Sequence, residues 1–403
     1  MTISLSQRVQ RVSLSANAAA KQRTNDLKKA GVDILDLTTG EPDFDTPEHI
    51  KQATYEAIAR GETKYTPTPG IRALREAVQR KLRQENQLEF GIDNLIIANG
   101  AKQIIFNAFA ATLNDGDEVI VPVPYWPTFP DSVRFNGGTP VLVECHLEQG
   151  YKLLPEQLAA SITARTRWLV LNHPGNPSGA VYSAQELQAL ADVLREHPHV
   201  LVMLDDLYEH ILFDGRERRN LLNVADDFQA RSLLVGGVSK TYAMTGWRIG
   251  FGAGPKALIT AMTVVQSQIS SGASSVSQAA ALAAYNGGLD FLAPQVAAYQ
   301  QRRDDIIGIL SGIDGLELTL PQGGFFVFCR CSGLIGRYRP GGSQLKSEAD
   351  VLDYLLENGV SAVGGSAYGL SPYFRLSIAT DNDTVKEAGR RIAAACARLS
   401  PAQ

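Results

Sequence analysis

Residues 200–210 have the sequence VLVMLDDLYEH, in which a short apolar run is followed directly by two acids. The run is apolar at odd and even positions alike, which is typical of a strand that is covered by helices on both faces. It is far shorter than the roughly 20 residues that a membrane-spanning helix needs. The run WLVL at 168–171 has the same character. These runs predict strands of a buried, mostly parallel β-sheet.

Strand-like segments alternate with amphipathic helical segments along the first two thirds of the chain. The expected strands are 95–98, 118–121, 141–144, 168–172, 200–205 and 231–236. This alternation is typical of βαβ units, so we expect an α/β fold with helices on both sides of the sheet. Beyond it, one long helical stretch at about 255–309 and short strands within GGFFVFC (323–329) and YFRLSIA (373–379) predict a smaller α+β domain.

Composition and charge exclude several classes of protein. The 403 residues are 44% hydrophobic and 20% charged, as in ordinary globular proteins. A formal charge of −4 offers no basic surface for nucleic acid or for an anionic membrane. The polar N-terminal segment lacks the apolar core of an export signal, so we expect a cytoplasmic protein. Four scattered cysteines have the wrong spacing for zinc, and we expect buried free thiols and no metal.

The segment VSKTYAMTGWRIG (238–250) places Lys240 after a strand and a Gly-Gly pair, eight residues before Arg248. A lysine at the end of a strand is most often a solvated charge. In a partly desolvated loop, however, its neutral amine becomes accessible for imine chemistry. Arg248 would offer a planar, permanently charged fork to a phosphate. Lys240 is therefore a candidate cofactor anchor.

Two strand ends carry candidate ring-binding residues. Asp205 ends its strand where open α/β sheets bind ligands, although such an acid is also a common helix N-cap. It would pair with a protonated pyridine nitrogen, and Tyr208 could direct its hydroxyl to the same ring. In LNHPGNPSGA (171–180), Asn176 is either part of an ordinary turn or the donor to a phenolate oxygen.

Two further segments could contact a flat, phosphorylated ligand. In IIANGAKQIIF, a strand passes into a helix through Gly100, Ala101 and Lys102, and the free N–H groups of such a junction favour a phosphate. In PVPYWPTF, either Trp126 or Tyr125 could stack on an aromatic ring, although packing is the commoner role of aromatic residues there.

Arg375 interrupts the apolar strand YFRLSIA near the C-terminus. A buried arginine needs either an internal acid or an anionic ligand, and bidentate capture of a substrate carboxylate is a natural use. The glycines of IGFGAGPKAL (249–258) suggest a dinucleotide fingerprint, but the G-x-G-x-x-G spacing is absent and no acid follows at the required distance. A nicotinamide-dependent reductase is therefore not expected.

Taken together, these motifs resemble those of a known enzyme family. Their order along almost the whole chain is GEPDFDTPEHI (40–50), GETKYTPTPGIRALREA (61–77), GAKQIIFNAF (100–109), PYWPTFP (124–130), NPSGA (176–180), DDLYEH (205–210), SKTYAMTGWRIG (239–250) and YFRLSIAT (373–380). The chain resembles the class I aminotransferases, and specifically the subgroup of bacterial aspartate and aspartate/prephenate aminotransferases. The resemblance implies pyridoxal phosphate as cofactor and fold type I. It implies an N-terminal arm with part of the small domain at 1–45, a large domain at 46–284 and a small domain at 285–403.

The resemblance also implies roles for the candidate residues. Lys240 would bind the cofactor covalently and, once released, move the α-proton of the substrate, while Asp205 would pair with the ring nitrogen. Asn176 and Tyr208 would bind the ring oxygen, and Trp126 would cover the ring face. The phosphate ligands would be the backbone of Gly100, Ala101 and Lys102, the side chains of Arg248 and Ser239, and Tyr65 of a second subunit. Arg375, Asn176 and the backbone of Gly40 would hold the α-carboxylate. A shared Tyr65 requires a homodimer.

The substrate is less closely defined by the motifs. Lys102 matches the lysine that related enzymes use for a distal carboxylate, but it is also a common type of solvated helix-start residue. Relatives have Ser-Ala-Thr where this chain has Ser15-Ala16-Asn17, and His173 and Gly175 replace small polar residues. We expect transfer between aspartate and 2-oxoglutarate, with aromatic amino acids, prephenate or basic amino acids as the alternative donors. A cofactor-sensing regulator would need an additional basic DNA-binding head, which we do not expect here.

Overall fold

The computed structural model describes residues 3–14 and 16–401, and its main feature is a sheet with the strand order β2-β8-β7-β6-β5-β3-β4. The strands are β2 (Leu95–Ala98), β3 (Glu118–Val123), β4 (Thr139–Glu144), β5 (Thr166–Asn172), β6 (Leu201–Asp205), β7 (Ser232–Gly237) and β8 (Gly250–Ala253). β8 is antiparallel to both β2 and β7, whereas the pairs from β7 to β4 are parallel. The mostly parallel sheet of an α/β protein is confirmed.

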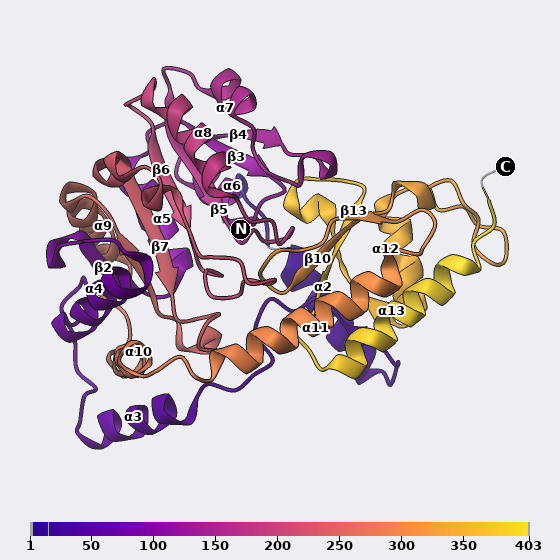
Figure 1. Cartoon of the computed structure of the whole chain (residues 1–403), viewed down its shortest axis with the longest axis horizontal. Helices are drawn as coiled ribbons and strands as arrows, with labels where there is room; N and C mark the ends of the chain where they lie inside the picture. Colours follow the sequence, from indigo (N-terminus) through magenta and orange to yellow (C-terminus); the bar gives the residue numbers. More distant parts are fainter. Residues whose placement is uncertain (1–2, 15, 402–403) are drawn as a thin grey trace.

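Helices cover both faces of this sheet, which explains why its strands are apolar throughout. On β2, Leu95 and Ile97 belong to one hydrophobic core, and Ile96 and Ala98 to another. The first core is completed by α4 (Arg72–Asn86), α8 (Ala184–Arg195) and α10 (Ser275–Asn286), and the second by α5 (Ala101–Thr112), α6 (Thr128–Phe135) and α9 (Lys256–Ile269). Figure 1 shows these helices flanking the sheet.

A second, smaller sheet has its own hydrophobic core. Its antiparallel order is β12-β13-β10-β9, formed by β9 (Glu317–Leu318), β10 (Phe326–Arg330), β12 (Val363–Gly364) and β13 (Tyr373–Ser377). The helices around it are α11 (Leu292–Leu310), α12 (Glu348–Glu357) and α13 (Asn382–Ala397), at the right of Figure 1. Near the N-terminus, β1 (Leu35–Asp36) pairs with β11 (Val360–Ser361), so the segment before residue 45 joins this part of the molecule. The remaining helices are α1 (Gln7–Gln10), α2 (Ala16–Lys29), α3 (Glu48–Ala59) and α7 (Pro155–Ser161).

The six strands predicted for the large sheet are all present, but the prediction of one continuous helix at 255–309 was wrong. The glycine-rich segment 249–258, which was not expected to bind a dinucleotide, contains strand β8. Phe251 of β8 pairs so closely with Gly236 of β7 that a Cβ on Gly236 would lie 2.4 Å from the Phe251 ring. The expected single helix at 255–309 is three helices. It breaks where Ser271 and Gly272 adopt positive φ, and again between Gly287 and Phe291.

The parallel strands bring their carboxyl ends together at one edge of the sheet. Asn172 is directly opposite Asp205 in the register of β5 and β6, and Asp205 is opposite Val235 on β7. The loops that follow these strands therefore meet beside the smaller sheet. Within the described ranges, no helix is both long and apolar enough to span a membrane.

Candidate active site

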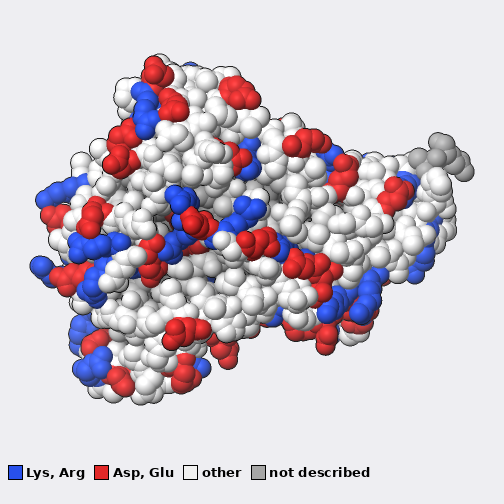
Figure 2. Space-filling model, viewed as in Figure 1, with Lys and Arg blue, Asp and Glu red and all other residues white. Residues whose placement is uncertain are grey.

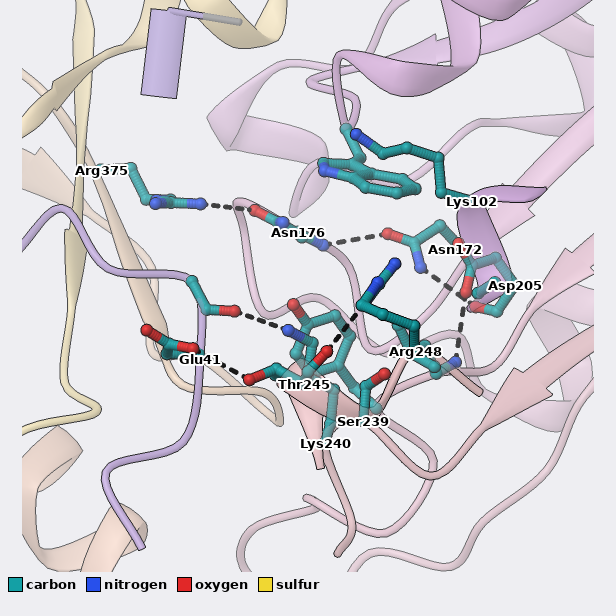
Figure 3. Close-up of a pocket in the computed structure, with 15 residues that line it drawn as sticks. Glu41, Lys102, Asn172, Asn176, Asp205, Ser239, Lys240, Thr245, Arg248 and Arg375 are labelled. Atoms are coloured by element: carbon teal, nitrogen blue, oxygen red, sulfur yellow. Dashed lines mark hydrogen bonds between the residues drawn. The ribbon is translucent and has the colours of Figure 1, made fainter. Parts of the chain in front are cut away.

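A cavity of about 340 Å³ lies at these strand ends, between the large sheet and the smaller one. Figure 3 shows its side chains converging from both parts of the chain. The predicted site residues that line it are Gly40, Ala101, Lys102, Trp126, Asn176, Asp205, Tyr208, Ser239, Lys240, Arg248 and Arg375. Gly100 directly precedes this lining and is close to Arg248. The structure therefore brings together segments that are up to 335 residues apart, from Gly40 to Arg375.

Lys240 extends from the loop after β7 into this cavity. Its Nζ donates to the backbone oxygen of Gly40 at 2.5 Å and lies 5.7 Å from the centre of the Tyr208 ring. Burial lowers the pKa of Lys240 to about 8, with the charges of Arg375 and Arg248 acting in the same direction and the carboxylate of Glu41 opposing them. A much larger fraction of this amine is neutral near pH 7 than of an ordinary lysine, as a nucleophile or base requires.

Asp205 is buried at the end of β6, where its side chain is 3% exposed. Burial raises its pKa to about 7, although the Leu207 N–H, which donates at 3.2 Å, and the charge of Lys240 both act to lower it. Asn172 supports the strand end by donating to the backbone oxygen of Asp205 at 3.0 Å. A buried acid in this position suits a cationic ring nitrogen, because the two charges would compensate each other away from water.

The start of α5 and Arg248 form an anion-binding corner. Gly100 is the N-cap of α5 with φ 82°, no side chain caps the helix, and its first turn holds no acid. The positive φ at Gly100 favours glycine, and a Cβ there would lie 2.5 Å from Arg248 Nη2, so a larger residue would displace the Arg248 guanidinium. Arg248 itself has φ 56° and donates to the Thr245 backbone at 2.8 Å. An uncapped helix start beside a guanidinium fits a phosphate.

Arg375 enters the cavity from β13 and is 1% exposed. Its guanidinium donates to Asn176 Oδ1 at 3.1 Å and to the Thr38 backbone at 2.8 Å, while its Nε has no partner. The rings of Phe326 and Tyr368 lie 4.2 and 5.1 Å from its guanidinium carbon. Burial lowers the pKa of Arg375, yet an arginine remains charged. The site thus holds a desolvated cation with donor capacity to spare for a carboxylate.

Lys102 lies at the opposite wall, with its Nζ 5.0 Å from the centre of the Trp126 ring. Burial and the charge of Arg248 lower its pKa, and the charge of Asp131 opposes this shift. Across residues 3–14 and 16–401, none of the cations Lys102, Lys240, Arg248 and Arg375 forms an ion pair with a carboxylate. Acidic and basic side chains intermix on the face shown in Figure 2, whereas these four cations of the cavity have no carboxylate in ion-pair contact within the described part of the chain.

Three polar residues in the cavity, Glu41, Asn172 and Thr245, had no predicted role. Thr245 Oγ1 donates to Glu41 Oε2 at 2.9 Å, and Asn172 accepts from the Asn176 N–H at 3.0 Å. Asn172 could have been predicted, because it ends β5 next to Asp205 and the carboxyl ends of neighbouring parallel strands meet. Nothing in the sequence pointed to Glu41 apart from its position next to the predicted Gly40. The only indication for Thr245 was its closeness in sequence to Arg248.

Two predicted features lie elsewhere. Tyr65 is 98% exposed and lines a separate surface hollow with Lys64 and Ser271, so its role at a second subunit stays a prediction. His173 is buried against Tyr182, with ring centres 5.4 Å apart, and does not line the cavity. Burial lowers the pKa of His173 to about 4.

Of the Ser15-Ala16-Asn17 segment, Ser15 and the side chains of Ala16 and Asn17 lie outside the described residues. All four cysteines are buried and free, as predicted.

Comparisons with known proteins agree with this geometry. The family model described as aminotransferase class I and II matches residues 32–392. An aspartate aminotransferase of Rhizobium meliloti (strain 1021) is 50% identical over 388 residues, which are 96% of this chain and 93% of that protein. A probable aspartate/prephenate aminotransferase of Rickettsia felis is 45% identical over 397 residues, or 98% of this chain and 97% of the other.

Solved structures extend this similarity to the fold. The crystal structure of an aspartate aminotransferase from Rhizobium meliloti matches with a TM-score of 0.96 and 48% identity, covering 99% of this chain and 100% of the other. A Thermus thermophilus aspartate aminotransferase with maleate matches with a TM-score of 0.91 and 40% identity, covering 98% and 100%. The architecture is that of pyridoxal-phosphate enzymes of fold type I. The chain therefore belongs to the class I and II aminotransferases: it is a pyridoxal-phosphate-dependent transaminase that exchanges an amino group between amino acids and oxo acids.

Proposed function

We propose that the central cavity binds pyridoxal phosphate through Lys240, with the phosphate in the corner formed by the start of α5 and Arg248. Ser239, 5% exposed, adds a hydroxyl on that side. Asp205 faces the ring nitrogen, Trp126 covers the ring, and Asn176 and Tyr208 hold the ring oxygen. Burial raises the pKa of the Tyr208 phenol, while the charge of Arg375 and a hydrogen bond with Asn176 act against this shift; that hydrogen bond supports the pairing of Tyr208 with Asn176.

The residues of the proposed site then each have a defined part in amino transfer. Bound pyridoxal phosphate supplies an electron-withdrawing ring that makes the substrate α-proton acidic. Arg375 and Asn176 bind the α-carboxylate and thereby fix the orientation of the α-carbon. Lys240 acts as the base that takes up this proton, and the lowered pKa of its amine matches the task near neutral pH. Asp205 keeps the ring nitrogen protonated.

We propose that the preferred amino donor is aspartate and that 2-oxoglutarate is the acceptor. The observation that carries this proposal is Lys102, a cation at the cavity wall that lies above Trp126 and has no ion-pair partner among the described residues. Arg375 and Lys102 place one cation on each side of the cavity, and both acids carry two carboxylates. The aspartate aminotransferase from Thermus thermophilus was solved with maleate, which is also a dicarboxylate.

Prephenate is the second candidate among the acceptors, with an aromatic amino acid as the alternative donor. The name of the Rickettsia felis relative includes prephenate, which also carries two carboxylates. A hollow beside Lys102 is lined in part by Phe106, Trp126 and Phe135. These aromatic side chains would accommodate the ring of such a substrate. Both candidates use the same cofactor chemistry.

A donor panel with a matched variant separates the candidates. Purified protein is assayed with aspartate, phenylalanine and lysine at fixed 2-oxoglutarate, and with prephenate in place of 2-oxoglutarate. Lys102→Met keeps the length of the stem and removes the charge, so we expect kcat/KM for aspartate to fall by roughly 10- to 100-fold and that for phenylalanine to change little. Indifference of the parent protein to aspartate would exclude it as the donor, and an equal loss for both donors would exclude Lys102 as the distal carboxylate ligand.

We further propose a homodimer in which Tyr65 reaches the phosphate of the other subunit. Its full exposure supports this, as do the exposed apolar side chains of Tyr55 and Ile58 on α3 and of Val264 and Ile269 on α9. Chains carrying Tyr65→Ala are inactive as homodimers on this proposal, as are chains carrying Lys240→Ala. A hybrid of the two has one intact site and regains activity, whereas a hybrid without activity contradicts a shared site.

We propose the division into an arm at 1–45, a large domain at 46–284 and a small domain at 285–403, which is supported by the two sheets with separate cores. A cytoplasmic location is proposed as well. It is supported by four free cysteines, which suit a reducing compartment.

A further inference from the structure

Beside the loops that carry Tyr208 and Lys240 lies a cluster of buried and half-buried charged side chains that do not line the central cavity. It is formed by Lys81 and Glu85 on α4, by Glu209 and His210 in the loop after β6, and by Arg218. The same loop carries Tyr208, and the neighbouring loop after β7 carries Lys240. The cluster is therefore placed where it can act on both residues at once.

Glu209 fixes the first loop to α4. Its carboxylate accepts from Lys81 Nζ through a short contact and from Asn86 Nδ2 at 2.7 Å. Lys81 is 4% and Glu209 8% exposed. Burial alone would raise the pKa of Glu209, but the charges of Lys81, His210 and Arg218 outweigh burial and lower it to about 2. Glu209 thus stays ionised, and its ion pair holds the loop in one position.

His210 links the loop that Glu209 holds to the loop of Lys240. Its Nε2 lies 2.8 Å from Glu85 Oε2, and its Nδ1 lies 3.0 Å from the Thr241 hydroxyl. A hydroxyl both donates and accepts, so the contact with Thr241 is a hydrogen bond in every protonation state of the imidazole. Thr241 is 2% exposed and directly follows Lys240. Water therefore does not compete for the bond.

Buried ion pairs add little net stability compared with a well-packed apolar core. What such a cluster can provide is a defined geometry. Here the hydrogen bond of His210 ends on Thr241, which directly follows Lys240, and Glu209 directly follows Tyr208. A displacement of about 1 Å at a reacting group can slow a reaction by as much as roughly 100-fold.

We propose that Thr241 and His210 are positioning residues for Lys240: their hydrogen bond ties the loop of Lys240 to the loop of Tyr208 and keeps the amine in its catalytic position. The proposal rests on the proposed function, in which Lys240 is the cofactor lysine and the base. It assigns Thr241 no contact with the substrate.

Two conservative variants test this role. Thr241→Val keeps the shape of the side chain and removes the hydroxyl, whereas Thr241→Ser keeps the hydroxyl and removes a methyl group. We expect kcat of Thr241→Val to fall about tenfold or more with KM for the amino donor within about twofold, and kcat of Thr241→Ser to remain within about twofold of the parent. A merely packing role of Thr241 would give the opposite order.

Thr112 provides a matched control, because its hydroxyl also accepts a side-chain hydrogen bond, from Trp168 Nε1 at 2.9 Å, far from the cavity. Thr112→Val is expected to lower the melting temperature without lowering kcat. A visible spectrum of each loaded variant reports on Lys240 independently of turnover, and we expect a shifted absorbance for Thr241→Val only.

The outcomes separate this proposal from the proposed function. If reduction of the loaded parent with borohydride leaves no pyridoxyl group on Lys240, the proposed function fails. If the parent is labelled there but Thr241→Val has the kcat and the spectrum of the parent, or if Thr241→Ser loses as much activity as Thr241→Val, the positioning role is overturned.

Discussion

Arg375 Nη1 and Asn176 Oδ1 lie 3.1 Å apart, joining the small antiparallel sheet to the loop after β5 of the large sheet. This hydrogen bond crosses the cavity wall between two separate hydrophobic cores. A carboxylate bound here would contact both parts of the molecule at once.

Replacing Arg375 removes a desolvated donor that lacks a carboxylate partner. For Arg375→Lys we expect kcat/KM to fall roughly 100-fold for every amino donor, because an ammonium group cannot form the planar two-fold contact. Arg330→Gln is the control, since this arginine on neighbouring β10 pairs with Glu317 and Glu148 outside the cavity. Steady-state kinetics check both variants, and an unchanged kcat/KM for Arg375→Lys contradicts the role of Arg375.

Two successive acids offer a test of the ring-nitrogen contact. We expect Asp205→Asn to lower kcat by about 100-fold or more, because a neutral amide cannot stabilise a cationic ring nitrogen. Asp206→Asn should keep kcat within a few fold. Burial and the charge of Glu209 raise the pKa of Asp206 to about 8, so it is mostly protonated at pH 7, and it hydrogen-bonds Asn220. Equal losses in the two variants would point to a general effect of the loop.

The glycine at the start of α5 can be tested against another glycine with a positive φ. Gly100 has φ 82° and Gly116 φ 90°, but only at Gly100 would a Cβ meet another group, Arg248. Alanine at either position should lower the free energy of unfolding by about 1 kcal/mol. We expect Gly100→Ala alone to weaken binding of pyridoxal phosphate, by at least about tenfold, in equilibrium titrations. If Gly100→Ala binds pyridoxal phosphate with unchanged affinity, the phosphate does not bind in this corner.

The lowered pKa of Lys240 predicts a distinctive pH dependence in the cofactor-free protein. Only the neutral amine is acylated, and raising the pH produces it. The acylation rate of Lys240 should therefore rise up to about pH 8 and then level off. Lys256 is an internal reference, because its hydrogen bond to Asp93 raises its pKa above the ordinary value. Peptide mass spectrometry follows both residues. A rate for Lys240 that climbs in parallel with that of Lys256 refutes the lowered pKa.

Much of the fold was predictable from local sequence, because continuous apolar runs such as residues 200–204 identify buried parallel strands without knowledge of their neighbours. The strand β8 was not, since its Gly250 and Gly252 reflect close contact with α5 and β2, which are distant in sequence. The helix breaks near Ser271 and Gly287 could have been predicted, because the Ser-Gly pair at 271–272 and the Asn-Gly-Gly sequence at 286–288 are turn signals.

For the site, strand ends and the family motifs identified Lys240, Asp205, Asn176 and Arg375, which all line one cavity. Glu41 and Thr245 were missed because their proximity exists only after the N-terminal segment folds against the loop of Lys240. The buried cluster around Glu209 was missed for the same reason. Its members come from three separate segments, and in the sequence each looks like an ordinary surface charge.

The most direct test of the account is to locate the cofactor on the chain. The purified protein is loaded with pyridoxal phosphate, reduced with borohydride, digested and mapped by mass spectrometry, with Lys240→Ala in parallel. The account predicts one reduced pyridoxyl group per chain, on Lys240, and no turnover or bound-cofactor absorbance in Lys240→Ala. A label on Lys102 or on surface lysines with Lys240 unmodified, or transaminase turnover by Lys240→Ala, would contradict it.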